Sequence, residues 1–147
     1  MVTIKVKKLD RAAQVPRYAH VGMFGDLAAD VYASVAVTLA AGETRAVATG
    51  IALEFPSTHG ALVEDRSGLA MRGVTTLAGV IDPGYRGEIK VVMTNLGAAP
   101  FEIKVGDRIA QMRIVERIDA SFEEVGELGE AGLDGFRGAS GFGSTGA

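Results

Sequence analysis

Hydrophobic and polar residues alternate with a period of two along most of the chain. In residues 45–55 every second side chain, from Val47 to Phe55, is apolar or β-branched, and residues 88–94 repeat the pattern. Four shorter runs alternate in the same way, over residues 3–7, 34–39, 101–105 and 109–115. Successive side chains of a β-strand point to opposite faces, so this pattern predicts strands that each bury one face.

Proline positions and the scarcity of helical patterns agree with a fold built from strands. Pro16, Pro56, Pro83 and Pro100 lie at the edges of the alternating runs, where a missing amide donor does little harm. Only residues 67–72 have a helical pattern, and they span one or two turns. Many short strands joined by turns predict an all-β sandwich or a jelly-roll-like distorted barrel with one short helix.

The last part of the chain has a different composition. Acidic residues dominate from Asp119, and glycine recurs at every third position from Gly126 to Gly141. A glycine-rich segment buries too little apolar surface to order itself. We therefore predict a β-domain over residues 1–125 and a flexible glycine-rich arm over residues 126–147. A frayed terminus is the alternative to a functional arm.

Composition and charge exclude several classes of protein. The 147 residues carry a net charge of −3, which does not favour binding to nucleic acid or to an anionic membrane. The chain has no apolar run of about 18 residues and no cysteine for disulfides or thiolate metal sites. We expect a soluble, cytoplasmic protein of ordinary globular composition.

Two polar clusters in the first half of the chain contain residue types that bind metals and phosphates. A carboxylate at Asp30 suits a hydrated Mg²⁺ ion, and a turn aspartate that accepts backbone amides is the alternative. Arg66, Ser67 and Gly68 precede the predicted helix, where a cation, a hydroxyl donor and close backbone approach fit a phosphate. An N-cap serine beside a solvated arginine is the alternative.

Two further clusters lie in the second half of the chain. Asp82 begins a Pro-Gly turn and Tyr85 follows it, so the aspartate is placed to activate a water and the tyrosine to pack on a sugar. A hairpin with a capping aspartate and an aromatic rim explains the same residues. Arg108 and Gln111 carry donors for a phosphate chain, although a strand arginine is usually solvated surface. His20 has no partner at metal or triad spacing and is predicted to be a loop residue.

These clusters and the tail together resemble one family, the homotrimeric dUTPases, which hydrolyse dUTP to dUMP and pyrophosphate. Five segments resemble that family's motifs in the same order: GDLAADVYA, DRSGLAMRG, GVIDPGYRGEI, GDRIAQMRI and RGASGFGSTG. The resemblance implies a jelly-roll fold, a homotrimer with sites shared between subunits, and Mg²⁺ as the cofactor. It also implies a cellular role, which is to keep uracil out of DNA and to supply dUMP for dTMP synthesis.

The resemblance further implies a role for each matching residue. Asp82 would activate the water that attacks the α-phosphorus, Asp30 would act on Mg²⁺ through water, and Tyr85 would exclude UTP. The phosphate chain would be bound and the reaction assisted by Arg66, Ser67, Gly68 and Gln111. The hairpin would contact uracil through Gly79, Val80, Ile81 and Lys90. The arm would close over the nucleotide as a lid through Arg137, Phe142, Gly143, Ser144 and Thr145.

Two other functions compete with this interpretation. A dCTP deaminase shares the fold and a similar IDPG turn, but its catalytic glutamate would lie where this chain has Val92. A non-catalytic nucleotide-sensing or partner-binding protein on this scaffold would be expected to lose Asp82 or the arm, and both are present. The chain departs from the family pattern at Ala28, usually a glycine, and at Asp65, which replaces a proline often found before the arginine of the second motif.

Overall fold

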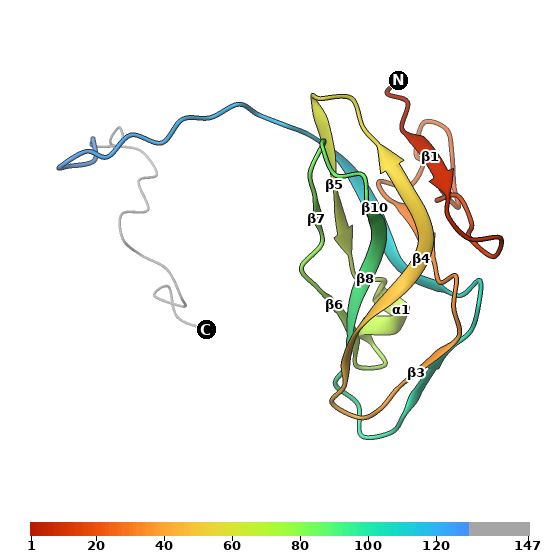
Figure 1. Cartoon of the computed structure of the whole chain (residues 1–147). Helices are drawn as coiled ribbons and strands as arrows, with labels where there is room; N and C mark the ends of the chain where they lie inside the picture. The colour runs from red at the N-terminus through yellow and green to blue at the C-terminus, as the bar shows by residue number, and fades with distance from the viewer. Residues whose placement is uncertain (130–147) are drawn as a thin grey trace.

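The structure, a computed structural model of the chain, describes residues 1–129, and its strands form three antiparallel sheets (Figure 1). The first sheet has the order β1-β4-β8-β6, with strands at Lys5–Lys8, Thr44–Glu54, Glu88–Asn95 and Val74–Leu77. The second has the order β2-β10-β5-β7, with strands at Ala29–Tyr32, Arg108–Glu116, His59–Glu64 and Val80–Ile81. A small third sheet pairs β3, Val37–Leu39, with β9, Phe101–Ile103, and the short helix α1 spans Ser67–Ala70.

The hydrophobic core joins the two four-stranded sheets. The face of residues 45–55 that the alternation predicted to be buried is buried, and so is the corresponding face of β8. The largest fully buried side chains come from both sheets: Ile51, Leu53, Ile89, Met93, Val31 and Ile109. Because burying one such side chain stabilises the fold by about 1.5–3 kcal/mol, this shared core fixes the two sheets relative to one another.

Strand β4 departs from strict alternation at Gly50. Its pairing with β8 shifts between Ala48 and Ala52, and Gly50 has a φ of 67°, in the left-handed region that favours glycine. A Cβ added at Gly50 would lie 2.9 Å from Ala13 Cβ. After this bulge both faces of β4 are buried as far as Leu53, which period-two alternation did not predict.

The prediction of an all-β fold is confirmed. In residues 1–129 the single helix is α1, and the sheets remain open instead of closing into a barrel. No helix in this part of the chain is long and apolar enough to cross a membrane.

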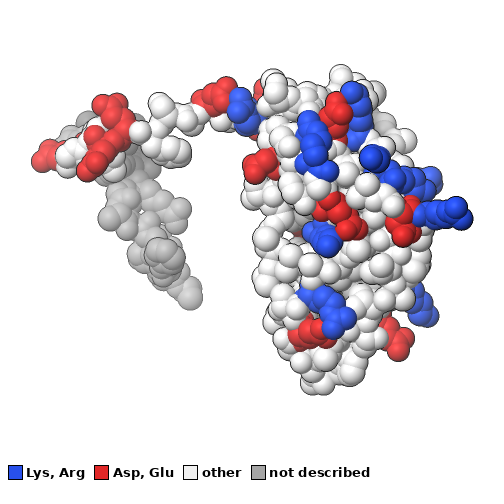
Figure 2. Space-filling model, in the orientation of Figure 1, with Lys and Arg blue, Asp and Glu red and all other residues white. Residues whose placement is uncertain are grey.

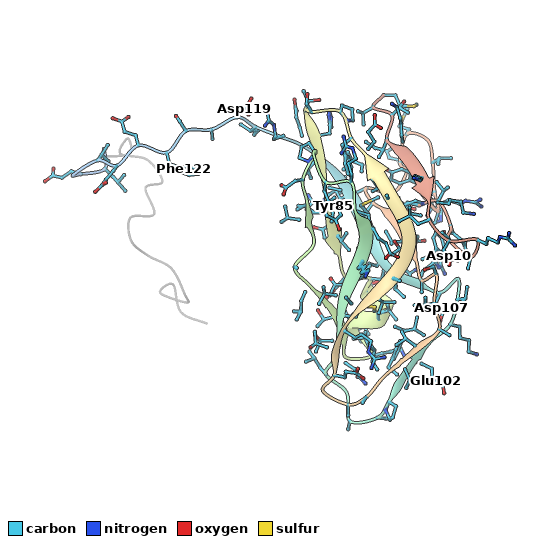
Figure 3. The ribbon with its side chains drawn as sticks, in the orientation of Figure 1. Asp10, Tyr85, Glu102, Asp107, Asp119 and Phe122 are labelled. Carbon is cyan, nitrogen blue, oxygen red and sulfur yellow. The ribbon has the colours of Figure 1, made fainter. Side chains whose placement is uncertain are left out.

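Beyond β10 the described chain extends away from both sheets (Figure 1). Arg117 donates its backbone N–H to the carbonyl oxygen of Thr58 at 2.8 Å, and the apolar side chains of Ile118, Phe122 and Leu128 beyond it are exposed. Figure 3 shows Phe122 far from the body of the molecule, and Figure 2 shows the acidic character of this segment. The division at residue 125 stays a prediction.

Candidate active site

A polar pocket of about 440 Å³ opens where β2, β10 and the start of α1 meet. The sheet register assembles it, because Gln111 on β10 pairs with Asp30 on β2 on one side and with Glu64 on β5 on the other. Directly paired residues on neighbouring strands face the same side of a sheet, so the three polar side chains form one row. The lining of what we call the polar pocket also includes Arg66, Ser67 and Gly68, which follow β5 and Asp65, and Arg108.

Asp30 lies in this pocket between two guanidinium groups. Its Oδ1 accepts a hydrogen bond from Arg66 Nε at 2.9 Å, and its Oδ2 lies 3.4 Å from Arg108 Nη1. The Asp30 side chain is only 14% exposed, so these ion pairs are less screened than surface pairs. The Asp30 carboxylate is thus bound by cationic side chains. The alternative, a turn aspartate that accepts hydrogen bonds from backbone amides, does not describe it.

Arg66 and Ser67 take up different positions at the start of α1. Arg66 is the N-cap, with an extended backbone at φ −91° and ψ 129°, and its side chain does not cap the helix. The interpretation of Ser67 as the N-cap is therefore wrong, because Ser67 is already the first helical residue. Ser67 and Gly68 are exposed at the pocket, where the hydroxyl and the first amides of the helix are accessible.

Gln111 and Asp65 connect the floor of the pocket to the chain behind it. Gln111 Nε2 donates to the carbonyl oxygen of Asp65 at 2.7 Å, while the Asp65 carboxylate accepts hydrogen bonds from Thr75 and Thr76 on β6. Burial raises the pKa of Asp65, but the hydrogen bonds from Thr76 and Thr75 outweigh it and hold the pKa below its ordinary value. In the sequence Asp65 stands out only as a replacement for proline, and nothing around it predicts these contacts.

The loop before β2 forms the rim of the polar pocket. His20 is a loop residue, as predicted, but it has a partner: its Nδ1 lies 3.1 Å from Asp26 Oδ1, and its backbone N–H donates to Asp26 Oδ2 at 2.8 Å. These hydrogen bonds, the backbone one above all, lower the pKa of Asp26. A separation of six positions within an irregular loop gives no periodic signal, which is why the pair was missed.

A second pocket, of about 350 Å³, lies at the turn between β7 and β8, and we call it the hairpin pocket after the hairpin that the sequence predicted. That prediction is wrong in its pairing, because β7 pairs with β5 of the second sheet and β8 with β4 and β6 of the first. It is lined by Val80, Ile81, Asp82, Tyr85, Glu88, Ile89 and Lys90. Asp82 is exposed, and its carbonyl oxygen accepts the backbone N–H of Tyr85 at 3.1 Å, which closes the predicted turn. The Tyr85 hydroxyl donates to the carbonyl oxygen of Glu88 at 3.0 Å, so the ring is held against β8 (Figure 3).

Gly79 permits the close approach of the hairpin to β5. Its φ is 116°, and its carbonyl oxygen accepts the backbone N–H of Val63 at 2.9 Å. A Cβ at this position would collide with the carbonyl oxygen of Val63. The hairpin backbone next to Val80 is therefore fixed by β5, although Gly79 itself does not line the hairpin pocket.

The two pockets do not meet within one chain. Ile81 on β7 pairs with Ala61 on β5, so the antiparallel register places Asp82 opposite Gly60. Arg66 lies six residues beyond Gly60 along the segment that contains β5. At about 3.3 Å per residue, these positions are about 20 Å apart. The structure therefore brings Asp30, Arg66, Ser67, Gly68 and Gln111 together and keeps Asp82, Tyr85 and Lys90 apart from them. The predicted arm residues Arg137, Phe142, Gly143, Ser144 and Thr145 lie outside the described residues.

Comparisons with known proteins agree on one family. The sequence model of the family described as dUTPase matches residues 19–146. The chain is 45% identical to the deoxyuridine 5'-triphosphate nucleotidohydrolase of Thermobifida fusca, over 99% of this chain and 79% of that protein. It is 42% identical to the enzyme of the same name from Clostridioides difficile, over 99% of both chains.

Solved structures give the same result for the fold. A mutant dUTPase of phage 80alpha superposes with a TM-score of 0.85 at 25% identity, over 97% of this chain and 98% of that one. A mutant dUTPase of phage phi11 of S. aureus, at 22% identity and a TM-score of 0.77, over 87% of this chain and 99% of that one, is similar in fold and coordinates a structural Mg(II) ion.

Proposed function

Since the chain belongs to the dUTPase family, we propose that it is a dUTP diphosphatase that hydrolyses dUTP to dUMP and pyrophosphate. The observation that carries the proposal is the pairing of Arg66 with Asp30 beside Ser67, Gly68 and Gln111 in one polar pocket. These groups offer a cation and several donors to a phosphate chain. In the cell, this reaction would keep uracil out of DNA and supply dUMP for dTMP synthesis.

The polar pocket would bind the phosphates. A triphosphate carries close to four negative charges, so the reaction depends on positioning and charge neutralisation more than on covalent intermediates. Arg66 and Arg108 supply fixed positive charge, and their contacts with Asp30 hold them in place before substrate arrives. Ser67 and Gln111 add neutral donors to the phosphate oxygens.

The hairpin pocket would bind the nucleoside and supply the base. Asp82 is exposed at the pocket, where its carboxylate could accept a proton from the water that attacks the α-phosphorus. Tyr85, held by Glu88, would pack on the deoxyribose and leave no room for a 2′-hydroxyl. Uracil would be recognised by the backbone of Gly79, Val80 and Ile81 and by Lys90.

A complete site would then require more than one subunit. The separation of about 20 Å along β5 between the level of Asp82 and Arg66 is too long for one phosphate chain to bridge within a protomer. We propose a homotrimer in which the hairpin pocket of one subunit faces the polar pocket of another. A closed ring of heterologous contacts gives each subunit both roles, so three sites form.

The residues present fit Mg²⁺ carried by the substrate. Among residues 1–129 no group of three or more His, Cys, Asp or Glu side chains could hold a metal ion alone. Mg²⁺ keeps several waters and is often held by one carboxylate together with substrate phosphates, a role that Asp30 suits. When bound, the ion would neutralise part of the phosphate charge, with Asp30 contacting it through water.

The glycine-rich arm would act as a lid on a neighbouring subunit. The 22 residues from 126 to 147, fully extended, reach at most about 70 Å, against a domain radius of gyration of about 15 Å. The residues between Arg117 and Arg137 include several acidic side chains and no lysine or arginine. The part of the arm suited to binding phosphate therefore begins at Arg137. Phe142 would stack on uracil, and Gly143, Ser144 and Thr145 would close on the phosphates.

The experiment that tests the function measures pyrophosphate release with Mg²⁺ from dUTP, UTP, dTTP and dCTP in parallel. We expect dUTP to be hydrolysed and the other three nucleotides to react far more slowly. Hydrolysis of UTP at the same rate as dUTP would show that Tyr85 does not exclude the 2′-hydroxyl. Release of ammonia from dCTP would favour the deaminase alternative, and no turnover of any nucleotide would favour a nucleotide-binding protein without catalysis.

A further inference from the structure

The carboxylate of Asp65 ties the segment that carries Arg66 to a strand of the other sheet. Asp65 Oδ2 accepts a hydrogen bond from Thr75 Oγ1 at 2.7 Å, and Oδ1 accepts bonds from Thr76 Oγ1 at 2.6 Å and from the Thr76 backbone N–H. The three residues are half-buried. Hydrogen bonds to an ionised group are about twice as strong as neutral ones, so three donors hold this side chain in one conformation.

This contact crosses between the two sheets. Asp65 follows β5 of the second sheet, whereas Thr75 and Thr76 lie on β6 of the first, where they pair with Thr94 and Met93 of β8. The connection through α1 is therefore held at two points: by β5 before it and by β6 behind it. Without the carboxylate, the turn that presents Arg66 would lose its direct side-chain bonds to β6.

The backbone of the same residue fixes Gln111. The carbonyl oxygen of Asp65 accepts the Gln111 side-chain amide at 2.7 Å. A carbonyl needs a donor, so the amide nitrogen faces Asp65, and the oxygen and one N–H of Gln111 remain available at the pocket. One residue thus orients two separate parts of the pocket lining.

We propose that Asp65 is a positioning residue, which holds the Arg66–Gly68 segment and Gln111 in the arrangement that receives the polyphosphate part of the substrate. Asp65 does not line the polar pocket, so it acts through its neighbours. Its charge is turned toward the hydroxyls and the amide of β6, which lets a carboxylate stand next to an anion site with less repulsion of the phosphates. The identity of the ligand as a triphosphate nucleotide rests on the proposed function.

The test compares ligands that differ in phosphate number. Binding of dUMP, of the α,β-imido analogue of dUTP and of inorganic triphosphate is measured for the wild-type protein and for Asp65→Ala. We expect the Kd for the imido analogue and for inorganic triphosphate to rise roughly tenfold to hundredfold, because small misplacement of binding groups has effects of this size. The Kd for dUMP should change less than about twofold, since most of its proposed contacts would lie in the hairpin pocket.

Two further variants separate positioning from general destabilisation. Thr75→Val removes one donor to Asp65 with little change of shape, and Thr75→Ser keeps that donor, so only the first should weaken binding of the imido analogue. Asp10→Ala is the matched control, because Asp10 also accepts a backbone N–H, from Ala12 at 2.6 Å, but lies in an exposed turn elsewhere (Figure 3). If Asp65→Ala does not fold, the comparison of the two Thr75 variants decides.

The inference is overturned if Asp65→Ala weakens all three ligands equally, or none, or if Thr75→Val and Thr75→Ser behave alike. Its failure is distinct from failure of the proposed function. Should the wild-type protein not hydrolyse dUTP, while Asp65→Ala still selectively weakens inorganic triphosphate, the function is wrong and the positioning role of Asp65 stands.

Discussion

The polar pocket and the hairpin pocket differ in how far one chain completes them. In the polar pocket Asp30, Arg66 and Gln111 are already bonded to one another or to the backbone behind them. In the hairpin pocket Asp82 is exposed, and no side chain within residues 1–129 forms an ion pair with it. The anion-binding half is preorganised, whereas the carboxylate of the proposed base has no cationic partner in the part of the chain that the structure describes.

This difference has a physical reason. A guanidinium held by a carboxylate keeps its geometry without substrate, so little ordering entropy is lost when phosphate binds. A catalytic base, by contrast, has to accept a proton from water, and strong pairing with a cation would lower its basicity. The contrast predicts that changes at the two pockets have different kinetic consequences.

The largest effect is expected in the hairpin pocket. Asp82→Asn keeps the size of the side chain but removes the base, so kcat for dUTP should fall by about 10²–10⁴-fold. Binding of the imido analogue should change little, because the polar pocket is untouched. Single-turnover rates and Kd values, measured beside Asp10→Asn as the control, check this prediction. Near-normal turnover would mean that Asp82 is not the base.

A mixture of two impaired proteins, assayed at a dUTP concentration too low for Arg66→Ala alone to bind it, tests whether the pockets come from different subunits. Co-expressed Asp82→Asn and Arg66→Ala chains should form trimers in which about a quarter of the sites combine two intact pockets, if subunits mix at random. Activity should therefore return to about a quarter of the wild-type value. A mixture no more active than its components would place each site within one chain.

The next effect is a loss of affinity in the polar pocket. Arg66→Ala removes the charge-assisted hydrogen bond that the guanidinium would donate to the phosphate chain, worth about 1.5–3 kcal/mol, so the Kd for the imido analogue should rise roughly tenfold to hundredfold. Arg66→Lys should recover only part of this, since an ammonium cannot reproduce the planar geometry of the guanidinium. Arg45→Ala, which breaks an exposed pair with Glu43 outside both pockets, is the control and should leave the Kd unchanged.

The sequence was sufficient to predict the strands with clear alternation and several residues that line each pocket, but not β2, β5, β6 and β7 or the connections among the pocket residues. Alternation over residues 88–94 and the turn at Asp82 depend on neighbouring residues, so both are visible locally. The pairs Asp30–Arg66 and Asp65–Thr75 join positions 36 and 10 residues apart. Such contacts depend on strand order and register, which cannot be read from a single sequence. The bulge at Gly50 was missed because burial there follows the register shift instead of the alternation.

The smallest effect concerns the pH dependence of stability. Burial raises the pKa of Asp65, but hydrogen bonds from Thr76 and Thr75 lower it more, so the folded-state pKa lies below the unfolded-state value of 3.8. A lowered pKa contributes stability above that unfolded-state value, and the contribution is lost as the pH falls through the folded-state pKa. Asp65→Asn should therefore be less stable than the wild type near pH 7, by about 1 kcal/mol. Urea unfolding at fixed protein concentration between pH 7 and pH 3 should show this gap narrowing only below about pH 4. When Thr75→Val is introduced into both proteins, the stability difference between them should become smaller but keep its sign. A stability difference that stays constant across this pH range would show that β6 does not hold the ionised form of Asp65.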